Sequence, residues 1–347
     1  MHKADFDYTL PEELIAQNPP EHRGDSRMMI LNAKTGGCEI VPFRRIVDFL
    51  LPGDCVTLNN TRVIRARLFA LKDTGAHIEI MLLRPQSDPM RWTCFLKPGK
   101  RAPEGTVLTL LHRDETPAPY TVRVVAKDPA GECVVEFAGA PVDRILDDCG
   151  HIPLPPYIKR QNLPPDAERY QTVYSKVNGS AAAPTAGLHF TPELLEKIQA
   201  KGVNIGYVTL HVGLGTVRPV KEDDIEQHDM HSEYCVIPPE TATLINETKA
   251  RGGRVICVGT TSCRTLESWA QEDGHMEPSA GWTSIYIYPG YRFKVMDALV
   301  TNFHLPQSTL IMLVSALAGR EHVLHAYEEA VKERYRFFSF GDAMFVS

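Results

Sequence analysis

The sequence lacks the features that mark a disulfide-linked, zinc-binding or membrane protein. Its eight cysteines form no C-x-x-C pair, and several lie inside apolar runs where a small buried thiol packs well. The longest largely apolar stretch, Leu310 to Ala318, is well short of the ~20 residues that span a bilayer, and the first residues have no apolar core of signal-peptide length. We therefore expect a cytoplasmic protein with reduced cysteines and no membrane anchor.

The sequence also lacks a net positive charge. It has 37 basic and 43 acidic residues, which gives a formal net charge of −6. RNA binding would therefore depend on local basic surfaces rather than on the overall charge. Arginine beside an aromatic residue suits phosphate contact and base stacking, although such charges are more often merely solvated. The candidate groups are Arg62, Arg65 and Arg67; Tyr157, Lys159 and Arg160; and Arg334, Tyr335 and Arg336.

The order of the expected elements divides the chain of 347 residues into two domains. Strands and helices alternate in residues 1–62 and again in 150–347, which is typical of an α/β fold. From Val63 to Gly139, β-rich runs recur at short spacing without a helical period, and a helix over Val142 to Cys149 follows. We predict a main α/β domain of residues 1–62 and 150–347 and an inserted all-β barrel or sandwich of residues 63–149.

Within the main domain, five prolines between His151 and Pro165 predict a stiff connection without helix or central strand. Strands are expected at Met28 to Leu31, Cys38 to Phe43, Cys55 to Leu58, Ile205 to His211, Glu233 to Ile237, Arg254 to Val258 and Thr283 to Tyr288. Helices are expected at Pro11 to Gln17, Arg44 to Leu51, Pro192 to Lys201, Glu240 to Arg251, Cys263 to Ala270, Ser308 to Ala318 and Glu321 to Arg334.

Three polar runs follow expected strands or precede expected helices. Thr260, Thr261 and Ser262 come after a buried strand, where helix N–H groups and hydroxyls bind an anion, with Arg264 nearby. The alternative is that Ser262 simply caps the helix. The run His211 to Thr216 offers a glycine loop, but it lacks the third glycine of a dinucleotide fingerprint, so a Rossmann interpretation is weak.

The third run, Ala183 to Thr191, has small residues upstream of His189 and a natural helix N-cap at Thr191. His189 is either a general base or a polar ligand contact on a tight loop, or else a structural histidine that caps backbone groups. A further cluster of Glu226, His228, His231 and Glu233 matches no established metal-ligand spacing and reads more simply as a solvated segment.

Taken together, the motifs resemble the S-adenosylmethionine:tRNA ribosyltransferase-isomerase family of queuosine biosynthesis from one end of the chain to the other. The matching runs are NNTRV (59–63), AAAPTAGLHFT (181–191), HVGLGT (211–216) with Arg218-Pro219-Val220, MHSEY (230–234), GTTSCRTLES (259–268), TNFHLPQSTLIMLVSALAG (301–319) and YRFFSFGDAM (335–344).

This resemblance implies the two-domain fold predicted above and a specific reaction. The ribosyl part of S-adenosylmethionine would be transferred to the aminomethyl group of a 7-aminomethyl-7-deazaguanine base at the tRNA wobble position. Adenine and methionine would leave, and the product would be epoxyqueuosine. The resemblance implies S-adenosylmethionine as a co-substrate and no metal or redox cofactor, and we expect the protein to act as a monomer.

The same resemblance points to site residues. Histidine suits proton transfer near neutral pH, which gives His189, His211, His231 and His304 as unranked catalytic candidates. The expected substrate-binding residues are Asn60, Arg62, Thr185, Gly187, Gly213, Gly215, Arg218, Glu233, Thr260, Thr261, Ser262, Arg264 and Asn302. We further expect His189 and the Thr260 to Ser262 loop to face one cavity, with the loop receiving the methionine carboxylate.

Two other functions stay open on the sequence. A noncatalytic RNA-binding module built on the β-domain would retain tRNA without depending on S-adenosylmethionine. A metal-dependent hydrolase using His228 and His231 would lose activity with a chelator.

Overall fold

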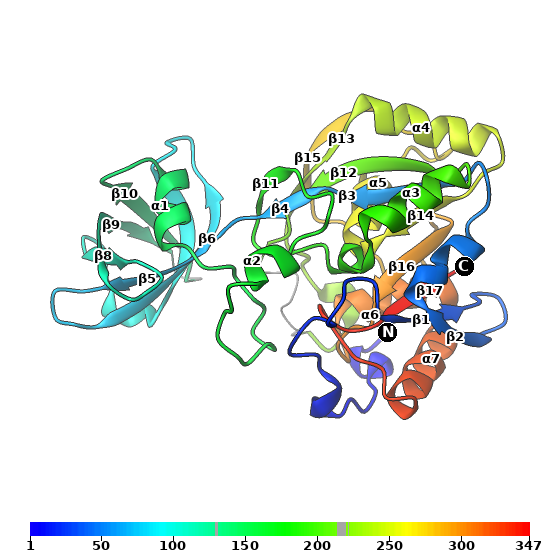
Figure 1. Cartoon of the computed structure of the whole chain (residues 1–347), viewed down its shortest axis with the longest axis horizontal. Coiled ribbons are helices and arrows are strands. Elements are labelled where there is room, and N and C mark those ends of the chain that lie inside the picture. The colour runs from blue at the N-terminus through cyan, green and yellow to red at the C-terminus, as the bar shows by residue number, and fades with distance from the viewer. Residues whose placement is uncertain (129–130, 214–219, 221) are drawn as a thin grey trace.

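The computed structural model describes residues 1–128, 131–213, 220 and 222–347 (Figure 1). In Figure 1 the barrel strands and α1 (Val142–Cys149) lie apart from the remaining elements, and both chain ends lie in the larger part. The mixed α/β class with an inserted β-barrel is therefore confirmed.

The larger part is built on a nine-stranded sheet with the order β15-β13-β12-β3-β14-β16-β17-β1-β2. The central neighbours β12, β3, β14 and β16 are parallel, whereas β17 runs antiparallel to β16. The strands are β1 (Arg27–Leu31), β2 (Cys38–Pro42), β3 (Cys55–Asn59), β12 (Asn204–Leu210), β13 (Glu233–Ile237), β14 (Val255–Val258), β15 (Ser279–Thr283), β16 (Ala298–Asn302) and β17 (Ala343–Val346).

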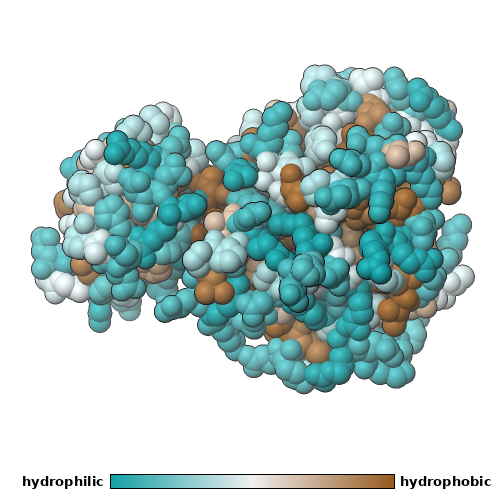
Figure 2. All heavy atoms as spheres, in the orientation of Figure 1, coloured by the Kyte–Doolittle hydropathy of each residue, from teal (hydrophilic) through white to brown (hydrophobic). Residues whose placement is uncertain are grey.

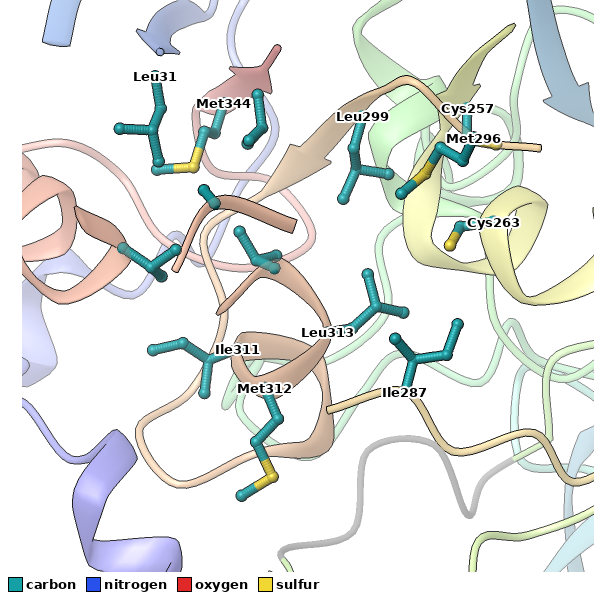
Figure 3. Packing of buried hydrophobic residues seen from close by; sticks show 14 of the residues in the cluster. Leu31, Cys257, Cys263, Ile287, Met296, Leu299, Ile311, Met312, Leu313 and Met344 are labelled. Atoms are coloured by element: carbon teal, nitrogen blue, oxygen red, sulfur yellow. The ribbon is translucent and has the colours of Figure 1, made fainter. Parts of the chain in front are cut away.

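Helices cover both faces of this sheet, so the central strands β3, β14 and β16 are buried at every position. In β14, Cys257 packs on one face while Ile256 and Val258 pack on the other, as the alternation of a strand requires. Figure 3 shows the first face, where Ile311, Met312 and Leu313 of α6 belong to one cluster with Leu299 and Cys263. The helices on that face are α4 (Pro239–Ala250), α5 (Gly259–Trp269), α6 (Thr309–Ala318) and α7 (Arg320–Lys332). The other face carries α3 (Pro192–Ala200) and the short 3₁₀ helices η3 (Phe43–Phe49) and η5 (Thr185–His189).

The smaller part is a closed antiparallel barrel with its own core. Its strands follow the order β10-β7-β6-β5-β8-β9, and α1 packs into the same cluster through Ile145 and Cys149. The strands are β5 (Arg67–Leu71), β6 (His77–Pro85), β7 (Arg91–Lys97), β8 (Val107–Leu111), β9 (Pro117–Lys127) and β10 (Cys133–Ala138). Each of the six corresponds to a β-rich run of the sequence, and the barrel alternative is the one observed. We propose that residues 63–149 form a separable domain, which limited proteolysis can test.

Several local predictions differ from the structure. Residues 11–17 hold only a 3₁₀ turn, η2 (Glu12–Leu14), and η3 replaces the helix expected after Phe43. The strand that pairs with β13 at the edge of the sheet is β15 (Ser279–Thr283), and it ends where the predicted strand was to begin. The strand expected over residues 283–288 is therefore wrong. Strands β16 and β17 were not anticipated, although β14, which is equally short, was. Three further short elements are α2 (Asp166–Arg169), β4 (Thr61–Val63) and β11 (Val177–Ser180).

The visible surface carries no large apolar band. On the face shown in Figure 2, hydrophilic residues predominate and hydrophobic ones form small separate groups. Within the residues that the structure describes, no helix has both the length and the apolar character needed to span a bilayer.

Candidate functional site

A cavity of about 270 Å³ opens where the neighbouring parallel strands β14 and β16 end. Ligands of α/β proteins commonly bind beyond the carboxyl ends of such strands. We call it the strand-end cavity. Its walls combine the start of α5, the residues that follow β16, the loop before η5 and an aromatic side. The residues used below are Tyr157, Thr185, Val212, Thr260, Thr261, Thr301, Asn302, His304 and Phe338.

Asn302 is the most constrained polar residue of this cavity. Its amide Nδ2 donates to the Phe338 carbonyl at 2.9 Å and to His189 Nε2 at 3.3 Å. A carbonyl can only accept, so these contacts fix which end of the amide is nitrogen. The remaining atom, Oδ1, is buried and has no partner among the described residues. A buried acceptor without a partner is costly, so a ligand donor at this wall would gain a ready hydrogen bond.

His189 lies behind Asn302 and outside the strand-end cavity. Its Nδ1 is 2.7 Å from Ser26 Oγ, and its Nε2 accepts from Asn302. An accepting Nε2 places the proton of the neutral ring on Nδ1, which then donates to Ser26. Burial lowers the pKa of His189 to about 4, in keeping with a neutral ring. The expectation that His189 and the Thr260 loop face one cavity is wrong, because a side chain of β16 stands between them.

His304 does line the strand-end cavity. Its Nε2 lies 2.7 Å from Thr301 Oγ1, and its main chain is held by Tyr8, whose hydroxyl donates to the His304 carbonyl at 2.5 Å. Burial lowers the pKa of His304 to about 3, so the ring is neutral near pH 7. Of the four histidines named from the sequence, this one lines the strand-end cavity.

Helix α5 begins at Gly259, four residues earlier than the sequence predicted. Thr260 and Thr261 therefore lie in its first turn and line the cavity, beside N–H groups that have no partner within the helix. Thr261 Oγ1 is buried and also has no partner among the described residues. The interpretation of Ser262 as an N-cap is wrong, since its Oγ donates back to the Val258 carbonyl at 2.8 Å. Thr191, by contrast, is confirmed as the cap of α3, where it accepts from Leu194 N at 3.2 Å.

An aromatic pair forms another wall of the strand-end cavity. The rings of Tyr157 and Phe338 stack with centroids 4.7 Å apart, and Tyr157 Oη is 2.5 Å from Ser339 Oγ. Both aromatics line the cavity, so its walls offer a flat apolar surface as well as polar atoms.

A second space, of about 480 Å³, lies between the barrel and the main sheet. We call it the interdomain cleft. One wall, from the larger part of the molecule, comprises Asn178, Gly179, His211, Val212, Gly213, His231, Ser232, Glu233, Tyr234 and Trp282, and the barrel wall comprises Leu83, Arg84, Pro85, Phe95 and Glu132. Val212 lines both spaces, so the cavity and the cleft approach each other at this residue.

His211 is positioned in the cleft by two contacts. Its Nδ1 is 2.8 Å from Thr61 Oγ1, and its ring lies against Gly179. Any side chain at position 179 would place a β-carbon 2.8 Å from the ring, so glycine is needed there. Burial lowers the pKa of His211, which keeps the ring unprotonated at neutral pH.

Arg264 and Glu233 form a buried ion pair beneath the cleft. Both side chains are almost fully buried, and Glu233 Oε1 also accepts from Gly213 N at 2.9 Å. Arg264 further donates to the Ile285 carbonyl at 3.3 Å. The pair thus fixes the end of β12, and Arg264 is not among the residues that line the strand-end cavity. Removing either partner would leave an uncompensated buried charge.

The other predicted residues lie apart from the strand-end cavity, except for Thr185. Asn60 accepts from Thr209 Oγ1 at 2.7 Å, and Arg62 donates to Ser175 Oγ at 3.1 Å on the surface. Gly187 is buried in η5. Gly215 and Arg218 lie outside the described residues.

The suspected metal-binding cluster does not assemble in the part of the chain that the structure describes. No group of three or more potential ligands is found there. His228 Nδ1 instead lies 2.9 Å from Glu222 Oε2, while His231 lines the interdomain cleft.

Two contributors had no signal in the sequence. Ser26 contacts His189 from 163 positions away. Trp282 adds an exposed aromatic to the cleft. Only the fold brings these residues to the site.

The whole chain is similar to known proteins. A family described as Queuosine biosynthesis protein matches residues 3–346. A protein of Clostridioides difficile (strain 630) named S-adenosylmethionine:tRNA ribosyltransferase-isomerase is 56% identical over 348 residues, which cover 100% of both chains. The crystal structure of an S-adenosylmethionine tRNA ribosyltransferase from Thermotoga maritima is 40% identical and covers 99% of this chain and 100% of that chain, with a TM-score of 0.56.

Proposed function

The chain belongs to the queuosine biosynthesis protein family, and we propose that it is an enzyme that uses S-adenosylmethionine to modify tRNA. The observation that carries this proposal is the pair of spaces meeting at Val212. A transferase with one small and one macromolecular substrate needs two such sites in contact, so that the reacting atoms are held together.

We propose the strand-end cavity as the site of S-adenosylmethionine. The N-terminus of α5 and Thr261 would receive the methionine carboxylate, because N–H groups and the positive end of the helix dipole favour an anion. Asn302 Oδ1 would accept from a ribose hydroxyl or from the adenine amino group. The Tyr157 and Phe338 stack supplies a flat apolar wall for the adenine.

The interdomain cleft would then hold the wobble base of the tRNA. We propose 7-aminomethyl-7-deazaguanine as that base, with its amine attacking the donor ribose across the boundary at Val212. Adenine and methionine would leave, and the sugar carbons would become the epoxycyclopentanediol of epoxyqueuosine.

The reaction requires a base, because the sulfonium acidifies the neighbouring C5′ hydrogens of the ribose. Three of the candidate histidines line these spaces: His211, His231 and His304. We favour His211 as this base, since it lies one residue from Val212 and its pKa is lowered by burial. His304 is then available to assist the departing adenine. His189 acts only through Asn302, as a positioning residue.

We propose that S-adenosylmethionine is the only small co-substrate, that no metal or redox cofactor takes part, and that the protein acts as a cytoplasmic monomer. Strong inhibition of adenine release by a chelator would contradict the cofactor proposal. Sedimentation analysis with and without tRNA tests the monomer.

The experiment that tests the function measures adenine and methionine release from S-adenosylmethionine. Release is expected only with tRNA that carries the aminomethyl base, and not with the same tRNA carrying guanine. Retention of tRNA without any release would instead favour the noncatalytic RNA-binding module.

A further inference from the structure

The edge of the main sheet presents two exposed aromatic side chains to the interdomain cleft. Tyr234 of β13 and Trp282 of β15 are direct cross-strand partners, and their rings lie edge to face with centroids 5.5 Å apart. Tyr234 is 36% exposed and Trp282 is 56% exposed, which is unusual for large apolar side chains. Both line the cleft that also contains His211.

The backbone beneath this pair is held firmly. Alternation along β13 buries Glu233 and Cys235 on either side of Tyr234, and Glu233 is anchored by Arg264. On β15, Gly281 receives the ring of Trp269 from α5, where a β-carbon would lie 3.0 Å from the ring atoms. Because neighbouring strand residues point to opposite faces, this packing directs Trp282 away from the core. The pair is therefore exposed by the architecture of the sheet, on a rigid support.

The surroundings decide which molecule this pair would bind. The cleft approaches the strand-end cavity at Val212, and its opposite wall carries Arg84 of the barrel, which donates to Glu132 at 3.3 Å. Exposed aromatic faces are a usual means of holding unpaired nucleotides, since every base has a stacking face. A base brought out of its loop for reaction at His211 leaves neighbours that have lost a stacking partner.

We propose that Tyr234 and Trp282 form a stacking platform for an unpaired nucleotide beside the reacting base in the tRNA anticodon loop. This proposal rests on the proposed function, because it takes the cleft as the tRNA site. In this role the pair contributes to the affinity of the protein for tRNA and takes no part in binding S-adenosylmethionine.

The test compares Trp282→Ala and Trp282→Phe with Leu51→Ala, a variant at a position that is equally exposed, 56%, and does not line the cleft. The affinity for tRNA bearing the aminomethyl base is measured by fluorescence anisotropy, and that for S-adenosylmethionine by calorimetry. Losing one base stack is expected to weaken tRNA binding about 5- to 150-fold in Trp282→Ala. Trp282→Phe should recover part of this loss, and Leu51→Ala should change neither affinity.

A second readout reports stacking directly. The chain has three tryptophans, so Trp92→Phe with Trp269→Phe leaves Trp282 as the sole indole emitter. Its emission should be quenched by tRNA and unaffected by S-adenosylmethionine. Unchanged tRNA affinity in Trp282→Ala, unquenched emission, or equal loss of both substrate affinities would each overturn the platform. Absence of adenine release by the unaltered protein would overturn the proposed function instead, because neither binding readout depends on turnover.

Discussion

The strand-end cavity and the interdomain cleft meet at Val212 but are built in different ways. The cavity presents neutral, buried polar groups whose orientation is set from behind, as Asn302 is by His189 and Phe338. The cleft presents exposed aromatic and charged side chains from two separate cores, one in the barrel and one in the main sheet. An orienting wall suits a small donor of fixed shape, whereas a partly exposed cleft suits part of a much larger molecule. Substitutions in the two spaces should therefore change different quantities.

The largest expected effect is a loss of turnover, and it is expected where the two spaces meet, beside Val212. His211→Gln should lower turnover about 10²- to 10⁴-fold, the range for losing a general base. Its affinity for S-adenosylmethionine should stay unchanged, because the ring lies on the cleft side of Val212. Single-turnover adenine release and calorimetry measure the two quantities, and His77→Gln on the barrel surface is the control. If the turnover of His211→Gln stays within about tenfold of the unaltered protein, His211 is not the base, and His304 becomes the candidate.

A smaller effect, on the affinity for S-adenosylmethionine, is expected inside the strand-end cavity. Thr261→Val keeps the shape of the side chain and removes an oxygen that has no partner among the described residues. It should raise the dissociation constant of S-adenosylmethionine about 2- to 12-fold, corresponding to one ordinary hydrogen bond. The free energy of unfolding should not fall, because no internal bond is lost.

The matched control for this substitution lies one turn along the same helix. Thr265 Oγ1 donates to the Thr261 carbonyl at 2.8 Å, so Thr265→Val should lower stability slightly and leave the S-adenosylmethionine affinity unchanged. The reverse pattern, with Thr261→Val destabilised and its affinity intact, would show that Thr261 serves the fold alone.

The last prediction concerns the pH dependence of stability. His189 titrates near 6.5 when unfolded, and its pKa is lowered to about 4 in the folded protein, so the unfolded chain binds more protons between these values. Its contribution to stability is complete above about pH 6.5 and is lost as the pH falls toward about 4. The free energy of unfolding, measured with urea, should therefore be lower at pH 5 than at pH 7. This decrease should be smaller in His189→Gln, and the difference in the slope of the free energy against pH corresponds to at most about one proton. An equal decrease in His189→Gln and the unaltered protein would contradict the neutral buried ring.

The parts of the fold that were predictable are those encoded locally. The six barrel strands have period-two runs bounded by turn residues, and Thr191 caps α3 through a contact three residues away. Short buried strands were found only in part: β3 and β14 were predicted and β16 was not, since a few apolar residues fit a strand or a helix equally well. For the same reason, the predicted start of α5 was four residues too late. Ser262 was therefore interpreted as a possible cap, whereas it lies inside the helix and donates back to the Val258 carbonyl.

The site was predictable in composition but not in arrangement. The sequence identified Asn302, Thr261 and the histidines as chemically suitable, yet their roles depend on contacts between distant positions. His189 contacts Ser26 and Asn302 and does not line the strand-end cavity, and Arg264 is ion-paired with Glu233. Such pairings follow from the order of strands in the sheet, which no single motif encodes.

The separation of the two spaces is tested most directly by a crystal structure of this protein with S-adenosylmethionine bound. The account predicts the donor in the strand-end cavity, with its carboxylate at the start of α5, a hydrogen bond to Asn302 Oδ1, and its C5′ atom toward Val212 and His211. A donor bound in the interdomain cleft beside Trp282, with the strand-end cavity empty, would contradict it.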